Sequence, residues 1–264
     1  MGICISSASS EIHQADDGLE EQIVSHGIEK LGSLYSKEGS KGVNQDAAVL
    51  HQGYGGEHGA FCGVFDGHGK NGHIVSKIKN ASSKMRTARD HSSERADDGS
   101  VPSESFHKWK EACISSFKVM DKEIKLQGSL DCSCSGTTAV VVLRQGDDLI
   151  IANLGDSRAV LGRINDQNGI MPVQLTTDLK PGSTRVTPRD RFIVLASDGV
   201  WDVLSNKEVV SIISTADSEL DAAKSVVEAA TAAWKRKFTS SKVDDCTAVC
   251  LFLQKRKQQS DFIF

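Results

Sequence analysis

Short apolar runs, separated by polar and glycine-rich stretches, set the pattern of this chain. They predict strands at 60–65, 138–143, 149–152, 158–161, 192–196 and 247–253. The runs between 138 and 161 are rich in β-branched residues and are joined by tight turns such as Gln145-Gly146-Asp147-Asp148. Short strands with such turns between them are typical of an antiparallel meander.

Apolar residues at spacings of three and four indicate helices elsewhere in the chain. Amphipathic helices are predicted at 106–124 and at 218–238. Shorter helices are expected from His73 to Asn80 and from Asn206, a favourable N-cap, to about Ser214. Because the antiparallel strands and the helices are segregated along the chain, the pattern predicts an α+β fold.

The 264 residues suffice for one large domain, which we place at 31–255. Residues 1–30 are polar and irregular and are predicted to be a tail, and residues 256–264 are predicted to be a second one. Residues 81–105 are dominated by Ser, Arg, Asp and Glu without periodicity, which predicts a surface loop or disordered insert.

Composition excludes some classes of partner. Hydrophobic residues make up 39% of the chain and charged residues 25%, as in an ordinary soluble protein. A net charge of −4 and a pI near 6.1 predict no nucleic-acid partner. Seven irregularly spaced cysteines, without a secretory segment, predict reduced thiols in the cytoplasm or nucleus. The longest apolar runs are too short to span a bilayer.

The N-terminus carries an acylation pattern. Gly2 followed by Ser6 fits N-myristoylation, and Cys4 offers a site for a second acyl chain. One myristoyl chain binds membranes weakly whereas two chains anchor stably, so the prediction is membrane contact through Gly2 and Cys4. The alternative is an unmodified terminus of small residues.

Asp66, Asp198 and Asp244 stand beside predicted strands. Carboxylates at neighbouring strand ends can converge, and carboxylates, carbonyls and water are the ligands that Mg²⁺ and Mn²⁺ prefer. Gly67 and Gly199 let the backbone turn sharply, so that a carbonyl can also face an ion. Two such ions can activate a water and neutralise the charge of a phosphoryl group. Taken singly, each aspartate would be a solvated turn residue.

Rival motifs fail at the same place. Gly67-x-Gly69-x-x-Gly72 has the form of a dinucleotide-binding turn, but the acidic residue expected after a second strand is missing. His68 stands where an EF-hand loop requires an oxygen ligand. No Walker loop is present, and Cys132-Ser133-Cys134 lacks partners for a zinc site.

Several short motifs follow one another in the chain: Asn44-Gln45-Asp46, Val64-Phe65-Asp66-Gly67-His68-Gly69, Ser135-Gly136-Thr137-Thr138-Ala139, Ala152-Asn153-Leu154-Gly155-Asp156-Ser157-Arg158, Leu195-Ala196-Ser197-Asp198-Gly199-Val200-Trp201-Asp202 and Asp244-Asp245-Cys246-Thr247. In wording and order they resemble the motifs of type 2C protein phosphatases, and with the Gly2-Ile3-Cys4 start they are similar to the plant branch. The resemblance covers most of 33–253. It implies hydrolysis of phosphoserine and phosphothreonine in proteins by metal-activated water. It also implies a four-layer sandwich of two antiparallel β-sheets flanked by helices.

The resemblance further implies a set of metal ligands. Asp66 with the carbonyl of Gly67, Asp198 and Asp244 match the positions that hold two Mg²⁺ or Mn²⁺ ions. Asp156 matches a position that helps hold a weaker third ion. Whether Asp244 or its neighbour in the chain, the aspartate at 245, is the ligand stays open.

Other motif residues would act on water and substrate. Asp46 looks like an outer-shell carboxylate that orients metal-bound water. His68 resembles the general acid that protonates the leaving oxygen, a role suited to an imidazole. Lys41 stands where members outside this branch carry a phosphate-binding Arg, and it supplies a point charge in place of a bidentate fork. Gln45 stands where many relatives have a metal-binding Glu, although plant members commonly carry Gln.

One departure from the family pattern is large. After Pro181-Gly182 the chain runs almost directly into Ser183-Thr184-Arg185, without the stretch that holds a substrate-side flap and a further strand. We predict an internal deletion near 182–184, as produced by alternative splicing, which leaves the sandwich incomplete. Lost core strands would leave unpaired edges and a cavity, and folded domains have only about 5–15 kcal/mol of stability to lose.

Different functions therefore stay open at this point. The first is a monomeric phosphatase that acts on phosphoproteins. The second is a non-catalytic or weakly active isoform that binds metal and partners without turnover. The third is an unstable isoform with no independent role.

Overall fold

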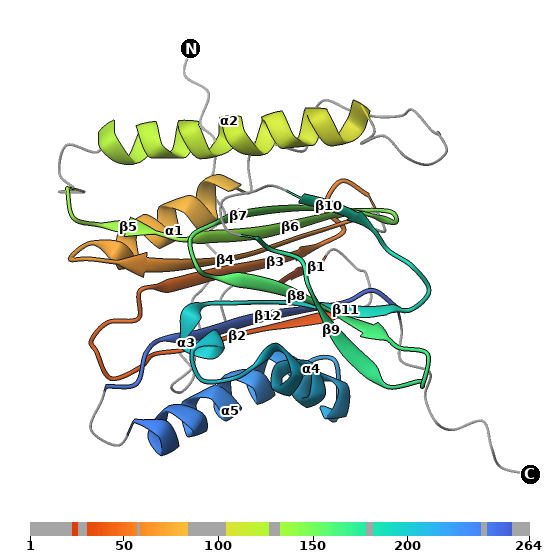
Figure 1. Ribbon diagram of the computed structural model, residues 1–264. Helices are drawn as coiled ribbons and strands as arrows, with labels where there is room; N and C mark the ends of the chain where they lie inside the picture. The colour runs from red at the N-terminus through yellow and green to blue at the C-terminus, as the bar shows by residue number, and fades with distance from the viewer. Residues whose placement is uncertain are drawn as a thin grey trace, which may run out of the picture.

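Two β-sheets lie face to face in this protein, and helices cover the outer side of each (Figure 1). The computed structural model describes residues 23–25, 31–56, 59–83, 104–126, 133–177, 182–238 and 242–254. The predicted sandwich of two sheets flanked by helices is confirmed. None of the described helices combines the length and the apolar character that a membrane span requires.

The first sheet has seven strands in the order β1-β3-β4-β6-β7-β10, with β5 paired to β4. Its strands are β1 (Ile23–Ser25), β3 (Asp46–Gln52), β4 (Ala60–His68), β5 (Gly136–Thr137), β6 (Ala139–Gln145), β7 (Asp148–Leu154) and β10 (Gly182–Arg185). Neighbours pair antiparallel, except that β1 runs parallel to β3.

The second sheet has five strands in the order β2-β12-β11-β8-β9, all antiparallel. Its strands are β2 (Gly32–Lys37), β8 (Arg158–Ile164), β9 (Ile170–Gln174), β11 (Asp190–Ala196) and β12 (Cys246–Phe252). The helices divide between the sheets. Those that contact the first sheet are α1 (Gly72–Ser83) and α2 (Glu104–Leu126), and those that contact the second are α3 (Asp198–Trp201), α4 (Asn206–Thr215) and α5 (Ala222–Lys237).

Alternation of side chains along the strands gives each sheet two apolar faces. On β4, Val64 faces the core between the sheets, where it joins Ile193 and Leu251 of the second sheet. Its neighbour Phe65 faces the opposite way, into a cluster with Phe117 of α2. A third apolar cluster lies between the second sheet and α4 and α5. The resulting order of layers is helix, sheet, sheet, helix (Figure 1).

The meander predicted between 138 and 161 is only partly correct. Strands β6 and β7 form the expected hairpin, but β8 pairs with β9 and β11 in the other sheet. The chain crosses at Gly155, whose φ of +95° lets it turn in a way that other residues rarely adopt. Turn residues in a sequence mark a change of direction, but they do not say in which sheet the next strand will pair.

Smaller differences concern the ends of elements. The N-cap of α4 is Ser205, which forms a capping box with Glu208, so Asn206 is the first helical residue instead of the predicted N-cap. Residues 81–83 of the predicted insert end α1, and 84–103 lie outside the described residues. Within the predicted N-terminal tail, 23–25 form β1. Strands β2, β3, β9 and β10 have no counterpart in the sequence prediction because their apolar runs are short or broken.

Candidate active site

Elements of both sheets meet around one pocket of about 490 Å³. The end of β4, the loop before β3, the start of α3 and the loop before β12 contribute to it. Its lining residues are Lys41, Gly42, Val43, Gln45, Asp66, Gly67, His68, Gly69, Lys70, His73, Asp198, Asp244 and Asp245. Most of the predicted site residues therefore come together, from positions more than 200 residues apart in the chain.

Two of the predicted carboxylates face each other across the β3–β4 ladder, where Asp46 is the register partner of Asp66. Asp46 is 3% exposed and accepts a hydrogen bond from Ser197 Oγ at 2.8 Å. Burial raises the pKa of Asp46 to about 7, against the lowering effect of hydrogen bonds from Thr247 and Ser197. Burial, together with the charges of Asp46 and Asp198, raises the pKa of Asp66 to about 10.

Two of the family motifs hold the backbone of Asp66 in place. The amide of Asp66 donates to Thr138 Oγ1 at 3.0 Å, and the amide of Thr138 donates to the Asp66 carbonyl at 2.8 Å. The Thr138 hydroxyl also lies 2.7 Å from Ser157 Oγ. Gly155 is required beside them, because a Cβ there would lie 2.7 Å from the Thr138 methyl carbon. These motif residues therefore support the strand end from which Asp66 projects.

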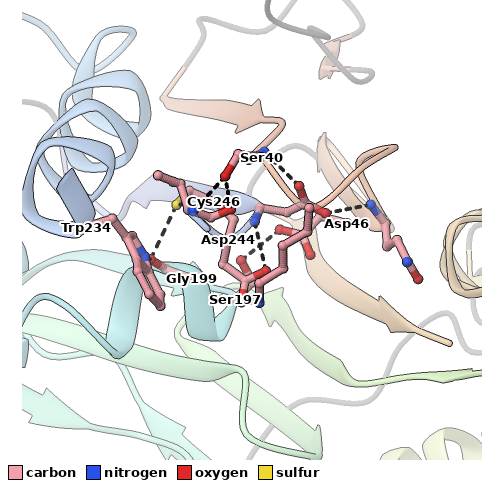
Figure 2. A network of polar contacts seen from close by, with 12 residues as sticks. Ser40, Asp46, Ser197, Gly199, Trp234, Asp244 and Cys246 are labelled. Atoms are coloured by element: carbon pink, nitrogen blue, oxygen red, sulfur yellow. Dashed lines mark hydrogen bonds and ion pairs between the residues drawn. The ribbon is translucent and has the colours of Figure 1, made fainter. Parts of the chain in front are cut away.

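Asp198 stands at the start of α3, directly after β11. The carbonyl of Gly199 accepts from Trp234 Nε1 at 2.7 Å and from Cys246 Sγ at 3.3 Å, which fastens α3 to α5 and β12 (Figure 2). Burial raises the pKa of Asp198, and the nearby charge of Asp244 adds to the increase. A hydrogen bond joins the carboxyl groups of Asp198 and Asp66.

Adjacent aspartates before β12 have different partners. Asp245 accepts from the backbone amide of Gly39 with one oxygen and from that of Gln45 with the other, both at 2.8 Å. Asp244 instead contacts the ammonium group of Lys41. Although burial lowers the pKa of Lys41, its hydrogen bond to Asp244 and the charges of nearby aspartates raise it. Asp245 thus joins two loops through backbone hydrogen bonds. The carboxylate of Asp244 has the Lys41 side chain as its partner.

His68 lies exposed at the end of β4, where its imidazole packs over Gly136 of β5. A Cβ at Gly136 would lie 2.6 Å from His68 Nε2. On the other side of the turn, the Gln45 amide nitrogen, oriented toward the carbonyls of Gly67 and Gly69, donates to them at 3.2 and 3.0 Å. The turn that carries Gly67 and His68 is therefore held from both sides.

The donor set suits Mg²⁺ or Mn²⁺. Asp66, Asp198 and Asp244 supply oxygen ligands, as does the carbonyl of Gly67, and hard divalent cations prefer such ligands. In the part of the chain that the structure describes, no group of three or more His, Cys, Asp or Glu side chains is arranged to hold a metal ion. The ligand types fit the ion, while the carboxylates face protein partners.

One predicted residue lies apart from the others. Asp156 is exposed in the turn after β7 and does not line the pocket. Its charge still acts on the site, since it adds to the effect of burial in raising the pKa of Asp198. Conversely, Val43, Lys70 and His73 line the pocket and were not predicted. Lys70 and His73 follow His68 within one turn and the start of α1, so their nearness in the chain was the available signal.

Comparison with known proteins places this chain in a family. The family model described as protein phosphatase 2C matches residues 37–185 and 172–236. A protein of Arabidopsis thaliana named "Probable protein phosphatase 2C 72" is 40% identical over 334 residues, which cover 98% of this chain and all of the relative. "Probable protein phosphatase 2C 12" of Oryza sativa subsp. japonica is 38% identical, over 96% of this chain and 92% of the relative. The chain belongs to the protein phosphatase 2C family.

Solved structures agree at the level of the fold. The crystal structure of a serine-threonine phosphatase 2C from Toxoplasma gondii superposes with a TM-score of 0.66 at 19% identity, covering 84% of this chain and 94% of that chain. The phosphatase Stp1 from Staphylococcus aureus superposes with a TM-score of 0.67 at 17% identity, covering 90% of this chain and all of that one. Both share the arrangement of the fold with this protein.

Proposed function

We propose that the pocket hydrolyses phosphoserine and phosphothreonine in proteins, with Mg²⁺ or Mn²⁺ as its resident ions. The observation that carries this proposal is the meeting of Asp66, Asp198, Asp244, His68 and Lys41 in one pocket built from both sheets. When bound, such ions activate water and offset the charge of a phosphoryl group. The alternative of a non-catalytic isoform has no observation in its favour among the described residues.

The residues divide into ligands and supporting groups. Asp66 with the Gly67 carbonyl, Asp198 and Asp244 would hold two ions, and Asp156 would help with a third. The partners of the two adjacent aspartates favour Asp244 over its neighbour as the ligand, because both oxygens of the neighbour already accept backbone hydrogen bonds. A carboxylate that joins two loops in this way is costly to redirect.

Other residues would handle protons and substrate. Asp46 lies buried behind Asp66 and accepts a hydrogen bond from Ser197. There it would orient water bound to the ion that Asp66 would hold. His68 is exposed at the pocket and would give its proton to the leaving oxygen of the substrate. Lys41 lines the same pocket and would attract the phosphate as a point charge.

Phosphate release from a phosphothreonine peptide in the presence of Mn²⁺ tests this proposal. Asp66→Asn should lower kcat/KM by about two orders of magnitude. His68→Gln should lower kcat by about a hundredfold, with a smaller change in KM. Asp148→Asn is the control, because Asp148 is an exposed residue at the start of β7 that pairs with Arg185 away from the pocket. Equal activity of Asp66→Asn and Asp148→Asn would contradict the proposal.

We propose in addition that a family segment is missing near 182–184, as alternative splicing would produce. Two observations support this. The 334 aligned positions with the Arabidopsis relative exceed the 264 residues of the chain, so at least 70 positions of the alignment have no residue here. The family model also matches in two pieces, 37–185 and 172–236. They overlap at 172–185, the range that contains Gly182. Sequencing transcripts of the gene should reveal a longer form that carries the segment; a single transcript would contradict splicing.

We further propose acylation of Gly2 and Cys4, membrane contact through them, and otherwise a monomer in the cytoplasm or nucleus. The support is the sequence pattern alone, since residues 1–22 lie outside the described residues. Fractionation of cells that express the wild-type chain, Gly2→Ala and Cys4→Ser tests the anchor. Gly2→Ala should move to the soluble fraction. Retention of that variant on membranes would contradict the myristoyl part.

A further inference from the structure

Lys41 and Asp244 are held together by the loops that carry them. The amide of Ser40 donates to the carbonyl of Val243 at 2.8 Å, and the amide of Val243 donates to Ser40 Oγ at 2.8 Å. Asp245 joins the same two loops through hydrogen bonds to the backbone on either side of Lys41. Figure 2 shows Ser40 and Asp244 within this network. These hydrogen bonds keep the backbone of Lys41 close to that of Asp244, so the two side chains can meet.

The contact with Lys41 engages Asp244, which is a predicted metal ligand. One carboxylate oxygen of Asp244 accepts from Lys41, and the other accepts from the amide of Asp245 at 3.1 Å. Asp66 and Asp198, the other two predicted carboxylate ligands, share a hydrogen bond with each other. Each carboxylate therefore has a protein partner. A divalent ion at Asp244 would repel the Lys41 ammonium at the same carboxylate, so Lys41 opposes binding of an ion there.

We propose that Lys41 is an internal cation that competes with the metal for Asp244, so that loading of the site releases Lys41 toward the substrate phosphate. The inference rests on the proposed function and adds a means of regulating the same site. The Lys41 side chain is 52% exposed and the Asp244 side chain 23% exposed, so the lysine can swing away on its flexible stem at little cost. One residue would then serve Asp244 and the phosphate in turn, which couples substrate binding to metal loading.

Lys70 provides a matched comparison. It lines the same pocket, is exposed, and makes no ion pair with another described residue. Removing either lysine lowers the positive charge of the pocket by one unit, so both changes raise metal affinity through the general electrostatic potential. Only removal of Lys41 also frees a ligand. The difference between the two variants therefore measures the competition itself.

Calorimetric titration of Mn²⁺ into the full chain, stripped of metal with a chelator, tests the proposal without substrate. Lys41→Met should bind Mn²⁺ about threefold to tenfold more tightly than wild type, and Lys70→Met less than about twofold more tightly. Lys41→Arg keeps the cation and should stay within about twofold of wild type. Equal affinities of Lys41→Met and Lys70→Met, or weaker binding by Lys41→Met, would overturn the proposal.

Thermal melts of the same proteins give a second readout. Without metal, Lys41→Met should melt about 2 °C below wild type, because the carboxylates lose their internal cation. With saturating Mn²⁺, its rise in Tm should exceed that of wild type. A Tm for metal-free Lys41→Met at or above wild type would count against the proposal. Failure of the wild-type chain to bind Mn²⁺ at all would overturn the proposed function, which is a different result from equal binding by the variants.

Discussion

At the scale of single residues, His68 owes its position to a neighbour without a side chain. Its imidazole packs directly over Gly136, where a Cβ would lie 2.6 Å from Nε2. Because the clash falls on the end of a side chain, Gly136→Ala should fold while moving the imidazole away. Loss of a positioned general acid costs about 10²–10⁴-fold in rate, so we expect kcat to fall at least tenfold with KM nearly unchanged.

Steady-state kinetics check this prediction. The loss in Gly136→Ala should appear in kcat, with KM nearly unchanged. Gly182→Ala is the matched control, since Gly182 is also in a strand and a Cβ there has its nearest contact at 4.0 Å. Equal kinetics of both variants would show that Gly136 does not position the imidazole.

The adjacent aspartates before β12 should respond differently to loss of charge. Asp245→Asn replaces one acceptor of a backbone amide by a donor and should lower the free energy of unfolding by about 1–2 kcal/mol. Asp244→Asn should leave stability nearly unchanged and weaken Mn²⁺ binding by at least about tenfold. Urea unfolding and Mn²⁺ titration of both variants check this. Loss of Mn²⁺ binding in Asp245→Asn, with loss of stability in Asp244→Asn, would contradict the assignment.

The sequence could name Asp66, Asp198 and His68 because each lies within a local motif at a strand end. It could not separate Asp244 from Asp245, because neighbours in a chain carry the same local signal. The distinction arises from a loop about 200 residues earlier, whose backbone amides bind Asp245 while its Lys41 side chain contacts Asp244. Such a contact is set by tertiary structure alone.

At the scale of elements, an ion pair between a buried aspartate and a half-buried arginine closes the turn into β11. Asp190, which is fully buried, accepts from Arg163 of β8 at 2.6 Å and from the amide and hydroxyl of Thr187 at 2.8 and 2.9 Å. Burial alone would raise the pKa of Asp190, but the hydrogen bonds from Arg163 and Thr187 outweigh it and hold the pKa below its ordinary value. Asp190→Asn should lower the free energy of unfolding by about 2–4 kcal/mol.

The loss should depend on pH in a defined direction. A carboxyl group whose pKa is lowered by folding stabilises the protein above its unfolded pKa of about 3.9, and that contribution disappears as the pH falls through the folded pKa. The gap in unfolding free energy between wild type and Asp190→Asn should therefore be full at pH 6 and shrink below about pH 4. Urea unfolding at several pH values checks this; a constant gap down to pH 3 would contradict the assignment to Asp190.

The sequence predicted helices and strands well where an apolar pattern repeats over many residues. It failed where pairing with another strand decides whether a segment is a strand. The spacing of apolar residues predicted α2 and α5 because their packed faces repeat over several turns. It missed β10, a strand of four residues whose side chains are no more than half-buried. What defines β10 is its ladder with β7, in which Gly182 pairs with Ile151. A ladder partner is not visible in the strand's own sequence.

At the scale of the whole molecule, the pocket depends on both sheets. Asp46 and Asp66 come from the first sheet, and Ser197, which donates to Asp46, follows a strand of the second. The site therefore exists only when the sheets are packed together through the apolar core between them. Strand β10 lies at the predicted deletion near 182–184 and pairs with β7, so that it forms the edge of the first sheet there.

This arrangement has a consequence for stability. The core between the sheets contains fully buried side chains from both of them, such as Leu50 and Leu195. We therefore expect the chain to melt in one cooperative transition and to be stabilised by Mn²⁺. Scanning calorimetry with and without Mn²⁺ checks both expectations, and a broad melt insensitive to Mn²⁺ would point to an unstable isoform.

The most direct test is the rate of phosphate release from a phosphothreonine peptide by the intact chain as Mn²⁺ is added. If the pocket is a working phosphatase site, the rate rises with Mn²⁺ and saturates, and Asp66→Asn abolishes the rise. A chain that melts cooperatively and binds Mn²⁺, but releases phosphate no faster than Asp66→Asn, would contradict the proposed function.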